Sequence, residues 1–442
     1  MTRTIAAIAT APGNGGIGVV RISGPDADRV LQRVCRIVPH RMEPRALTRI
    51  RVHDPEDGRV IDDGLAARFP APASYTGDDV VELQLHGGTV VLATCLDAVL
   101  RAGAVAATPG EFTERAFRSG RLPLDRAEAV AALIAARSES ALRVARRQLD
   151  GALAAAIRDA GEPIRAALAA VEASIDYPED VGEPDPDHLV GAFEEATRRI
   201  DRLLAGAERG LRLENGAHVV LVGRPNAGKS SLLNRLAGRE HAIVTPIPGT
   251  TRDAVAVDIV LTGVAVRLVD TAGLRETTDP VEQIGVARAR SEAADADIVV
   301  VVLDATAPAW PDGVDPADPR ILRVRNKVDL ADVPGGSSTS DEVPTSAKLP
   351  DGVDGLVGAL SRRLAGDVED DTVIVTKARH VVSLRAARTS ATRARDAALA
   401  GVPIDCVAVD AHAALGSLAE ILGGDGREET LREIFSRFCL GK

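Results

Sequence analysis

The chain has 442 residues and a net charge of −11, from 53 basic and 64 acidic residues, which argues against a protein coated in basic charge to hold nucleic acid. Its length suggests roughly two to four domains, and 45% hydrophobic with 26% charged residues excludes a globally disordered chain. No apolar stretch is long enough for a membrane span, and the first residues show no convincing secretory signal, so we expect a cytoplasmic protein. Four cysteines, none at metal or redox spacing, indicate neither a disulfide framework nor a zinc site.

The N-terminal part of the chain is rich in strand patterns. Residues 15–22 and 80–86 have strand character, and in the second segment Val81, Leu83 and Leu85 alternate with three polar residues. The polar residues therefore share one face of this strand. We predict a small α+β module with a polar sheet face, although such a face by itself is most often simply solvated.

Helical patterns lie on both sides of a central segment. Residues 125–173 are rich in Ala and Leu with helical periodicity, and residues 189–211 are helical again. Helical patterns return at 377–399 and 411–422. The simplest arrangement is one helical domain interrupted by an inserted domain, and the alternative is two separate helical bundles.

The central segment opens with a nucleotide-binding pattern. A short apolar strand, 218–222, leads into residues 223–230, GRPNAGKS, which match G-x-x-x-x-G-K-[ST] and precede a helical pattern. Glycines in such a loop let backbone N–H groups close around phosphate oxygens, and the helix N-terminus adds its positive end. Lys229 is expected to reach the β- and γ-phosphates, and Ser230 to ligate magnesium. The residues predicted to contact the nucleotide here are Asn226, Ala227, Gly228, Lys229, Ser230 and Ser231.

The strands that follow end in motifs that select guanine. Strand 264–270 ends in Asp270-Thr271-Ala272-Gly273, where the carboxylate can hold the magnesium shell and the Gly273 N–H can face the γ-phosphate. Strand 321–326 leads into Asn326-Lys327-Val328-Asp329, in which Asp329 can accept two hydrogen bonds that guanine offers and adenine does not. Lys327 can lie along the base plane, and Ser346-Ala347-Lys348 fits the loop that contacts the guanine oxygen. Because apolar strands alternate with helical stretches, we predict a parallel sheet with the ligand at the carboxyl ends of its strands.

A switch loop is predicted between these motifs, at residues 245–253, TPIPGTTRD. Thr251 is assigned a hydroxyl on magnesium and an N–H on the γ-phosphate, so that the loop relaxes when the phosphate leaves. In Ras-like enzymes a Gln after the D-T-A-G run positions the attacking water, but this chain has Leu274 there. Catalysis must therefore recruit another residue, a monovalent cation or a partner. The nearby candidates are Arg275, Glu276 and Glu282.

These motifs together resemble the MnmE/TrmE (ThdF) family of tRNA modification GTPases. The resemblance covers GRPNAGKSSLLN, TPIPGTTRD, DTAGLR, NKVD and SAK, and also GIGVVRISG, SYTGDDVVELQLHGG, TPGEFTERAF and FCLGK. It implies a multidomain α/β protein with an N-terminal α+β folate-binding and dimerisation domain at residues 1–117. It further implies a helical domain at 118–214 and 373–442, interrupted by an inserted Ras-like P-loop GTPase domain at 215–372.

The resemblance also implies a function. Members of the family would form homodimers and work with a flavin-dependent partner of the MnmG/GidA type, which carries FAD, in a heterotetramer or larger complex. Together the two proteins would add an aminomethyl or carboxymethylaminomethyl group to the wobble uridine of certain tRNAs. The one-carbon unit would come from a tetrahydrofolate derivative, and hydrolysis would rise when two GTPase domains meet.

Family site residues carry over position by position. A cation held by oxygens beside the phosphates can do the work of an arginine finger, which answers the absence of the Gln. Glu282 matches the catalytic Glu that orients the attacking water through another water, and Cys439 matches a terminal cysteine considered for a direct chemical role. The potassium positions are Asn226, Thr245, Ile247 through its backbone carbonyl, and Thr250. The folate positions are Arg21, Glu82, Arg121 and Lys442.

Two other classes of protein are alternatives. A GTP-dependent RNA or ribosome assembly switch usually carries an RNA-binding appendage after its GTPase domain, whereas this chain returns to helix. Folate binding would separate that class from the modification enzymes. An ATP-dependent kinase is inconsistent with Asn326-Lys327-Val328-Asp329, which selects guanine.

Overall fold

The computed structural model describes residues 3–239, 256–261, 263–270, 294–311, 313–330, 342–365, 375–424 and 428–442. The chain forms two compact units, each assembled from separate stretches. Unit 1 comprises residues 1–131, 148–154 and 419–442, and unit 2 comprises residues 132–147 and 155–418. This division is coarser than the four predicted segments, whose boundaries stay predictions. In the described part of the chain, no helix is both long and apolar enough to cross a membrane.

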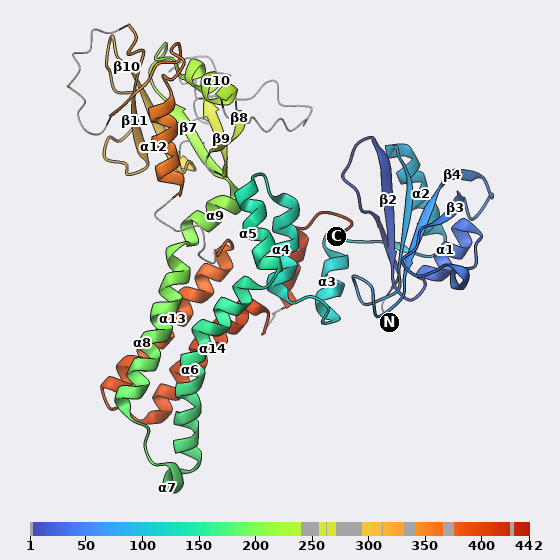
Figure 1. Cartoon of the computed structure of the whole chain (residues 1–442), viewed down its shortest axis with the longest axis horizontal. Coiled ribbons are helices and arrows are strands. Elements are labelled where there is room, and N and C mark those ends of the chain that lie inside the picture. Colours follow the sequence, from blue (N-terminus) through green and yellow to red (C-terminus); the bar gives the residue numbers. More distant parts are fainter. Residues whose placement is uncertain are drawn as a thin grey trace. The chain divides into compact units, whose positions relative to one another are not determined.

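Unit 1 is built on a mainly antiparallel six-stranded sheet with the strand order β3-β4-β5-β2-β1-β6. Helices α1 (Ala27–Cys35) and α2 (Thr89–Arg101) pack on this sheet and share its apolar core (Figure 1). The alternation expected in β5 is confirmed, because Val81, Leu83 and Leu85 are buried. The strands are β1 (Ile5–Ile8), β2 (Gly15–Ser23), β3 (Thr48–His53), β4 (Val60–Phe69), β5 (Val80–Gly87) and β6 (Val105–Ala106), and a short 3-10 helix, η1, spans Pro39–Arg41.

Residues from the end of the chain pack in unit 1 against the segment that follows the sheet. Helices α3 (Glu111–Arg118), α4 (Leu124–Ala135) and α15 (Glu428–Ser436) share a small apolar cluster. Its rings are Phe117, Phe435 and Phe438, with successive centroids 6.2 and 5.4 Å apart. Gly110 permits this packing, since its φ is +72° and a Cβ there would lie 2.4 Å from the Phe435 carbonyl oxygen.

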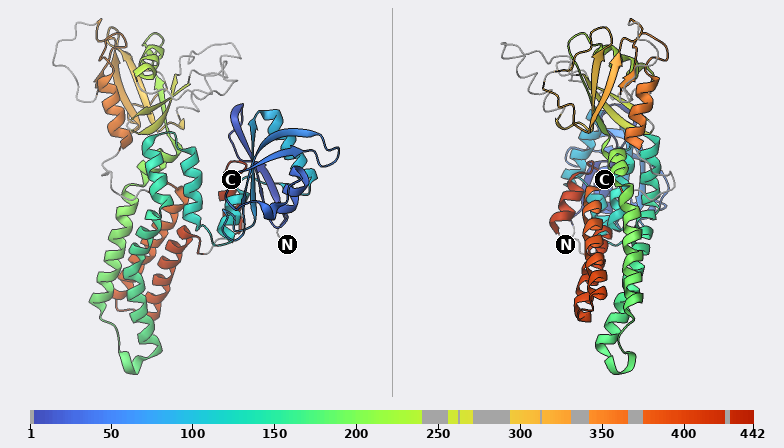
Figure 2. Two further views of the ribbon diagram at one scale, coloured as in Figure 1. Left: turned by 45° about the vertical axis from the view of Figure 1, so that its right-hand side comes forward. Right: turned by 90° about the vertical axis from the view of Figure 1, so that its left-hand side faces the viewer.

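The helical part of unit 2 is drawn from both sides of the central sheet. Helices α8 (Pro186–Ala205) and α13 (Ala378–Leu399) lie side by side in Figures 1 and 2, although one precedes the sheet and the other follows it. This packing supports one interrupted helical domain over two separate bundles. The predicted helical stretch at 125–173 is in fact three helices, α4, α5 (Glu139–Leu149) and α6 (Ala152–Asp176), because the chain turns between them. The remaining helices are α7 (Pro178–Val181), α9 (Ala207–Asn215) and α14 (Ile404–Leu422).

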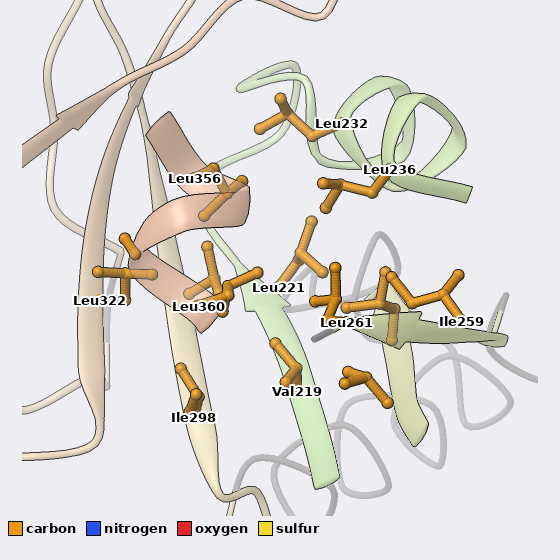
Figure 3. Packing of buried hydrophobic residues seen from close by; sticks show 14 of the residues in the cluster. Val219, Leu221, Leu232, Leu236, Ile259, Leu261, Ile298, Leu322, Leu356 and Leu360 are labelled. Carbon is orange, nitrogen blue, oxygen red and sulfur yellow. The ribbon is translucent and has the colours of Figure 1, made fainter. Parts of the chain in front are cut away.

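The central sheet of unit 2 has the order β12-β11-β10-β7-β9-β8 and is parallel except for β8, which runs antiparallel to β9. Helices α10 (Lys229–Arg239) and α12 (Asp354–Ala365) cover one face. Figure 3 shows Leu232, Leu236, Leu356 and Leu360 of these helices over Leu221 of β7. Because the parallel strands end at one edge, the loops that follow them meet there. The strands are β7 (Ala217–Val222), β8 (Ala256–Leu261), β9 (Val264–Asp270), β10 (Ile298–Asp304), β11 (Ile321–Asn326) and β12 (Glu342–Pro344).

Candidate functional site

The loop between β7 and α10 has a geometry that only glycine permits at two positions. Gly228 has a φ of +91°, and a Cβ there would lie 2.3 Å from Nδ2 of Asn326. A Cβ on Gly223 would lie 2.4 Å from the carbonyl oxygen of Val302, at the end of the neighbouring strand. The absence of side chains at these positions lets the loop lie close against the sheet edge, as a phosphate-binding loop requires.

The phosphate-binding loop is surrounded by an ammonium, a hydroxyl and a carboxylate, which belong to Lys229, Ser230 and Asp270. The Lys229 Nζ donates to the carbonyl oxygens of Gly223 and Arg224 at 2.8 and 3.1 Å, and burial lowers the pKa of Lys229 while Asp270 opposes the shift. Ser230 Oγ donates to Oδ2 of Asp270 at 2.5 Å. Asp270 is 3% exposed, and its Oδ1 has no hydrogen-bond partner in the part of the chain that the structure describes. A buried carboxylate oxygen beside a hydroxyl is a donor set that suits Mg²⁺, so the two side chains fit the predicted magnesium site.

The predicted guanine-binding residues meet at the ends of β11 and β12. Asn326 is 1% exposed, and its Nδ2 donates to the carbonyl oxygen of Ala227 at 2.9 Å, which ties this loop to the phosphate loop. Ser346 Oγ donates to Oδ1 of Asp329 at 2.6 Å and so orients a carboxylate that remains exposed. After Ser346, Ala347 is half-buried and Lys348 is exposed. An oriented, accessible carboxylate is what recognition of the guanine edge needs.

Lys327 is held by an acidic residue to which the sequence analysis gave no role. Its Nζ donates to Oδ2 of Asp304 at 2.6 Å, and Asp304 ends β10 in register with Asn326. The other oxygen, Oδ1, accepts from the backbone N–H and the hydroxyl of Thr306 at 2.9 and 2.6 Å. Although burial raises the pKa of Asp304, the hydrogen bonds from Lys327 and Thr306 lower it to about 2. A carboxylate at the carboxyl end of a buried parallel strand was the available signal.

Part of the predicted site lies outside the described residues. Among those that are described, Asn226 is exposed with a φ of +64°, a left-handed conformation in which Asn is enriched, and Ser231 is exposed on α10. The roles assigned to the others stay predictions. These other residues are Thr245, Ile247, Thr250, Thr251, Thr271, Ala272, Gly273, Arg275, Glu276 and Glu282.

A second group of predicted site residues comes together in unit 1. Arg21 on β2 and Glu82 on β5 are register partners, and the Arg21 Nε and Nη2 lie 3.0 and 2.9 Å from Oε1 of Glu82. Their side chains are only 16% and 20% exposed. Arg21 Nη1 also donates to the carbonyl oxygen of Gly441 at 3.2 Å. A Cβ on Gly441, whose φ is +89°, would lie 2.3 Å from the Ile8 carbonyl oxygen. The segment around Gly441 is therefore docked tightly against the sheet.

This docked segment places Lys442 beside the ion pair. Burial and the charge of Arg21 lower the pKa of Lys442, whereas Glu82 and Cys439 oppose the shift. Cys439 is exposed. Arg121 is also exposed and lies beyond the end of α3, and among the residues described it makes no hydrogen bond or ion pair with Arg21, Glu82 or Lys442. The structure thus gathers three of the four predicted folate positions.

Two aromatic residues flank the same guanidinium and were given no role from the sequence. The Arg21 Cζ lies 6.0 Å from the ring centroid of Tyr75 and 5.7 Å from that of Phe112. The Tyr75 hydroxyl is hydrogen-bonded to Thr113 Oγ1 at 3.0 Å, and burial raises the pKa of Tyr75. Phe112 is fully buried in the apolar core, whereas Tyr75 is 37% exposed, so Tyr75 is the ring that a ligand can reach.

Comparison with known proteins decides the family. Residues 4–121 match a family model described as the GTP-binding protein TrmE N-terminus, and residues 124–439 match the MnmE helical domain. A protein named tRNA modification GTPase MnmE from Chloroflexus aurantiacus is 45% identical to this chain over 100% of each chain. The protein of the same name from Moorella thermoacetica is 42% identical to this chain over 99% of each chain. The chain belongs to the MnmE/TrmE family. The MnmE protein of Neisseria meningitidis is 43% identical over 99% of both chains.

Membership of the MnmE family confirms the resemblance and the multidomain fold, and it identifies the chain as a GTPase of a family named for tRNA modification. A solved structure of an Aquifex aeolicus Era variant bound to GDP and aluminium fluoride is 24% identical and covers 39% of this chain and 66% of its own. Its TM-score of 0.28 is too low to support an argument.

Proposed function

We propose that this MnmE-family chain is a potassium-activated GTP hydrolase that modifies the wobble uridine of certain tRNAs. With a flavin-dependent partner of the MnmG/GidA type it adds an aminomethyl or carboxymethylaminomethyl group at position 5, using a one-carbon unit from tetrahydrofolate. The observation that carries this proposal is the second cluster, in which Arg21, Glu82 and Lys442 meet. A switch that only bound GTP would have no use for such a site.

In the GTP site each described residue has a separable task. The phosphate loop and Lys229 hold the phosphates, Ser230 and Asp270 hold Mg²⁺, and Asp329, oriented by Ser346, selects guanine. When bound, Mg²⁺ neutralises charge on the β- and γ-phosphates. Three further residues complete the site as predicted from the sequence: Thr251, Gly273 and Glu282.

Potassium takes the place of the absent Gln. Asn226, with its exposed side chain at the phosphate loop, is the first ligand, and the predicted loop at 245–250 supplies the others. A monovalent cation there adds positive charge where the transition state gains negative charge. Glu282 then orients the attacking water, a task that Leu274 cannot perform.

In the second site, the positive charges of Arg21 and Lys442 suit the carboxylates of a folate, and Glu82 offers acceptor oxygens to its ring N–H groups. Tyr75, which is 37% exposed, adds a flat apolar face beside them. Arg121, exposed beyond the end of α3, is the fourth folate position that the resemblance implies, and Cys439 is the candidate for a direct chemical role. The folate contributes the one-carbon unit.

The proposed assembly is a cytoplasmic homodimer that joins the flavoprotein in a heterotetramer or larger complex. The net charge of −11 supports a tRNA contact made largely through the partner, because phosphate binding needs basic surface. GTPase domains of two copies meet across the nucleotides and raise hydrolysis.

The test is GTP hydrolysis by the full chain in potassium and in sodium buffer at equal ionic strength, across protein concentrations, with tetrahydrofolate binding measured in parallel. We expect strong potassium stimulation that disappears in Asn226→Ala while GDP binding is retained. Equal rates in both salts would refute the potassium site. Failure of tetrahydrofolate to bind would refute the second site and favour a GTP-dependent assembly switch.

A further inference from the structure

The Asp304–Lys327 contact is built by the sheet rather than by flexible surface side chains. Asp304 and Asn326 are register partners on β10 and β11, and the N–H of Ala305 donates to the Asn326 carbonyl oxygen at 2.8 Å. The strand pairing and this hydrogen bond fix the distance between the ends of β10 and β11, and the Asp304 carboxylate and the Lys327 ammonium extend from those ends. Their side chains are 19% and 29% exposed, so the pair is partly shielded from water.

The two carboxylate oxygens of Asp304 have different partners. Oδ1 is occupied by the N–H and hydroxyl of Thr306, which fixes the rotation of the carboxylate. Oδ2 is thereby directed at the Lys327 Nζ, 2.6 Å away. Among the ion pairs of the described residues, this is the one that Lys327 makes. Its stem runs past the phosphate loop, because a Cβ on Gly228 would lie 3.9 Å from the Lys327 Cε.

We infer that Asp304 is a positioning residue for guanine-nucleotide binding, which acts by anchoring the ammonium of Lys327. With its end fixed at β10, the aliphatic stem of Lys327 is held along the line between the guanine loop and the phosphate loop. The nucleotide then meets a side chain that is already ordered, so less conformational entropy is lost on binding. Thr306 supports the same arrangement through Asp304. This inference rests on the guanine-nucleotide binding proposed above and deepens it.

The experiment is a double-mutant cycle on the full chain, with binding of a fluorescent GDP analogue as the readout. The four proteins are the unchanged chain, Asp304→Asn, Lys327→Met and the double variant. Asparagine keeps the size of aspartate and can still accept from Thr306, but it presents an amide NH₂ in place of the oxygen that faces Lys327. We expect Asp304→Asn to weaken binding roughly tenfold, since it removes a charge-assisted hydrogen bond.

The decisive number is the effect of Asp304→Asn in the Lys327→Met background. If Asp304 acts through Lys327, adding Asp304→Asn to Lys327→Met changes the affinity for the GDP analogue by less than about twofold. In the single variant Asp304→Asn, KM for GTP rises while turnover at saturating GTP stays near that of the unchanged chain. The reason is that the Asp304–Lys327 pair lies on the base side of the site. Asp315→Asn is the matched control, since Asp315 accepts from the N–H of Ala317 at 3.0 Å in a similar turn and should leave binding unchanged.

Two results overturn the inference: unchanged affinity in Asp304→Asn, or an equal loss with and without Lys327. If Asp304→Asn fails to fold, Thr306→Val carries the cycle, with an expected loss of about threefold that vanishes in Lys327→Met. Equal losses in that second cycle also overturn the inference. A failure of the unchanged chain to bind the analogue refutes the proposed function instead, and it is seen before any variant is compared.

Discussion

Replacing Gly228 by alanine tests how far nucleotide binding depends on the close approach between the phosphate loop and the guanine loop. Two separate costs arise in the structure. The φ of +91° is unfavourable for alanine by about 1–2 kcal/mol. The new Cβ, 2.3 Å from the Asn326 Nδ2, must also displace that amide from the Ala227 carbonyl oxygen.

The burial of Asn326 sets the size of the second cost, the loss of its hydrogen bond to Ala227. Asn326 is 1% exposed, so an amide pushed off its partner finds no water, and the loss is about 1–2 kcal/mol. Together the two costs are about 3 kcal/mol, which is a factor of roughly a hundred if it falls entirely on nucleotide affinity. The native loop must be formed for the nucleotide to bind, so most of the cost should appear there.

The assay is equilibrium titration of the full chain with a fluorescent GDP analogue, with thermal unfolding measured beside it. Gly238→Ala is the matched control, because Gly238 lies on α10, where a Cβ would meet nothing within 4 Å. That substitution should leave affinity unchanged and stabilise the helix slightly. Affinity of Gly228→Ala within about threefold of the unchanged chain would refute the reasoning.

Two further substitutions probe the metal site and the second cluster. Asp270→Asn removes the buried carboxylate beside Ser230. It should raise the Mg²⁺ concentration needed for half-maximal GTP hydrolysis by roughly tenfold or more, as measured by a metal titration. An unchanged titration would contradict the assignment of the metal to Asp270. Arg21→Met leaves Glu82 without its guanidinium and should lower the free energy of unfolding by about 2 kcal/mol and weaken tetrahydrofolate binding. Adding Glu82→Gln to Arg21→Met should restore stability but not ligand binding, as followed by denaturant unfolding and calorimetry, and restored binding would contradict the proposed role of the pair.

Two strands of the central sheet could be predicted to the residue because each is a short buried apolar run that ends at a motif. This holds for residues 264–270 and 321–326, which coincide with β9 and β11, whereas β7 begins one residue before the predicted run at 218–222. A strand buried on both faces needs continuous apolar sequence, and the polar motif that follows marks where the burial stops. The phosphate-loop and guanine-loop positions follow from the same pattern.

The boundaries of the helices were harder to predict from the sequence than those of the strands. Residues 125–173 have one continuous helical periodicity, yet the chain turns at Gly151, whose φ is +95°. The sequence Asp125-Arg126-Ala127-Glu128 has the form of a capping box, but α4 begins at Leu124 and the Asp125 carboxylate is buried. Local pattern does not distinguish a capping residue from one that tertiary packing draws into the helix.

Contacts between distant segments could not be predicted from periodicity at all. Neither the anchoring of Lys327 by Asp304 nor the docking of Gly441 beside Arg21 has a local signal, since each depends on which strand ends and chain segments the fold brings together. The resemblance named Lys442 and Arg21 as members of one site, and the structure adds the hydrogen bond from Arg21 to Gly441 that brings the neighbouring Lys442 close to Arg21.

The hydrogen bond between Arg21 and Gly441 joins residues 420 positions apart, and this separation sets an order of events during synthesis. At ordinary rates of translation, roughly 20–80 s separate the appearance of β2 from that of residue 441. The central sheet of unit 2 is completed within this interval, while the second cluster still lacks Lys442. A growing chain can therefore acquire its nucleotide-binding fold first, and the cluster around Arg21 is completed only after the docked segment has left the ribosome.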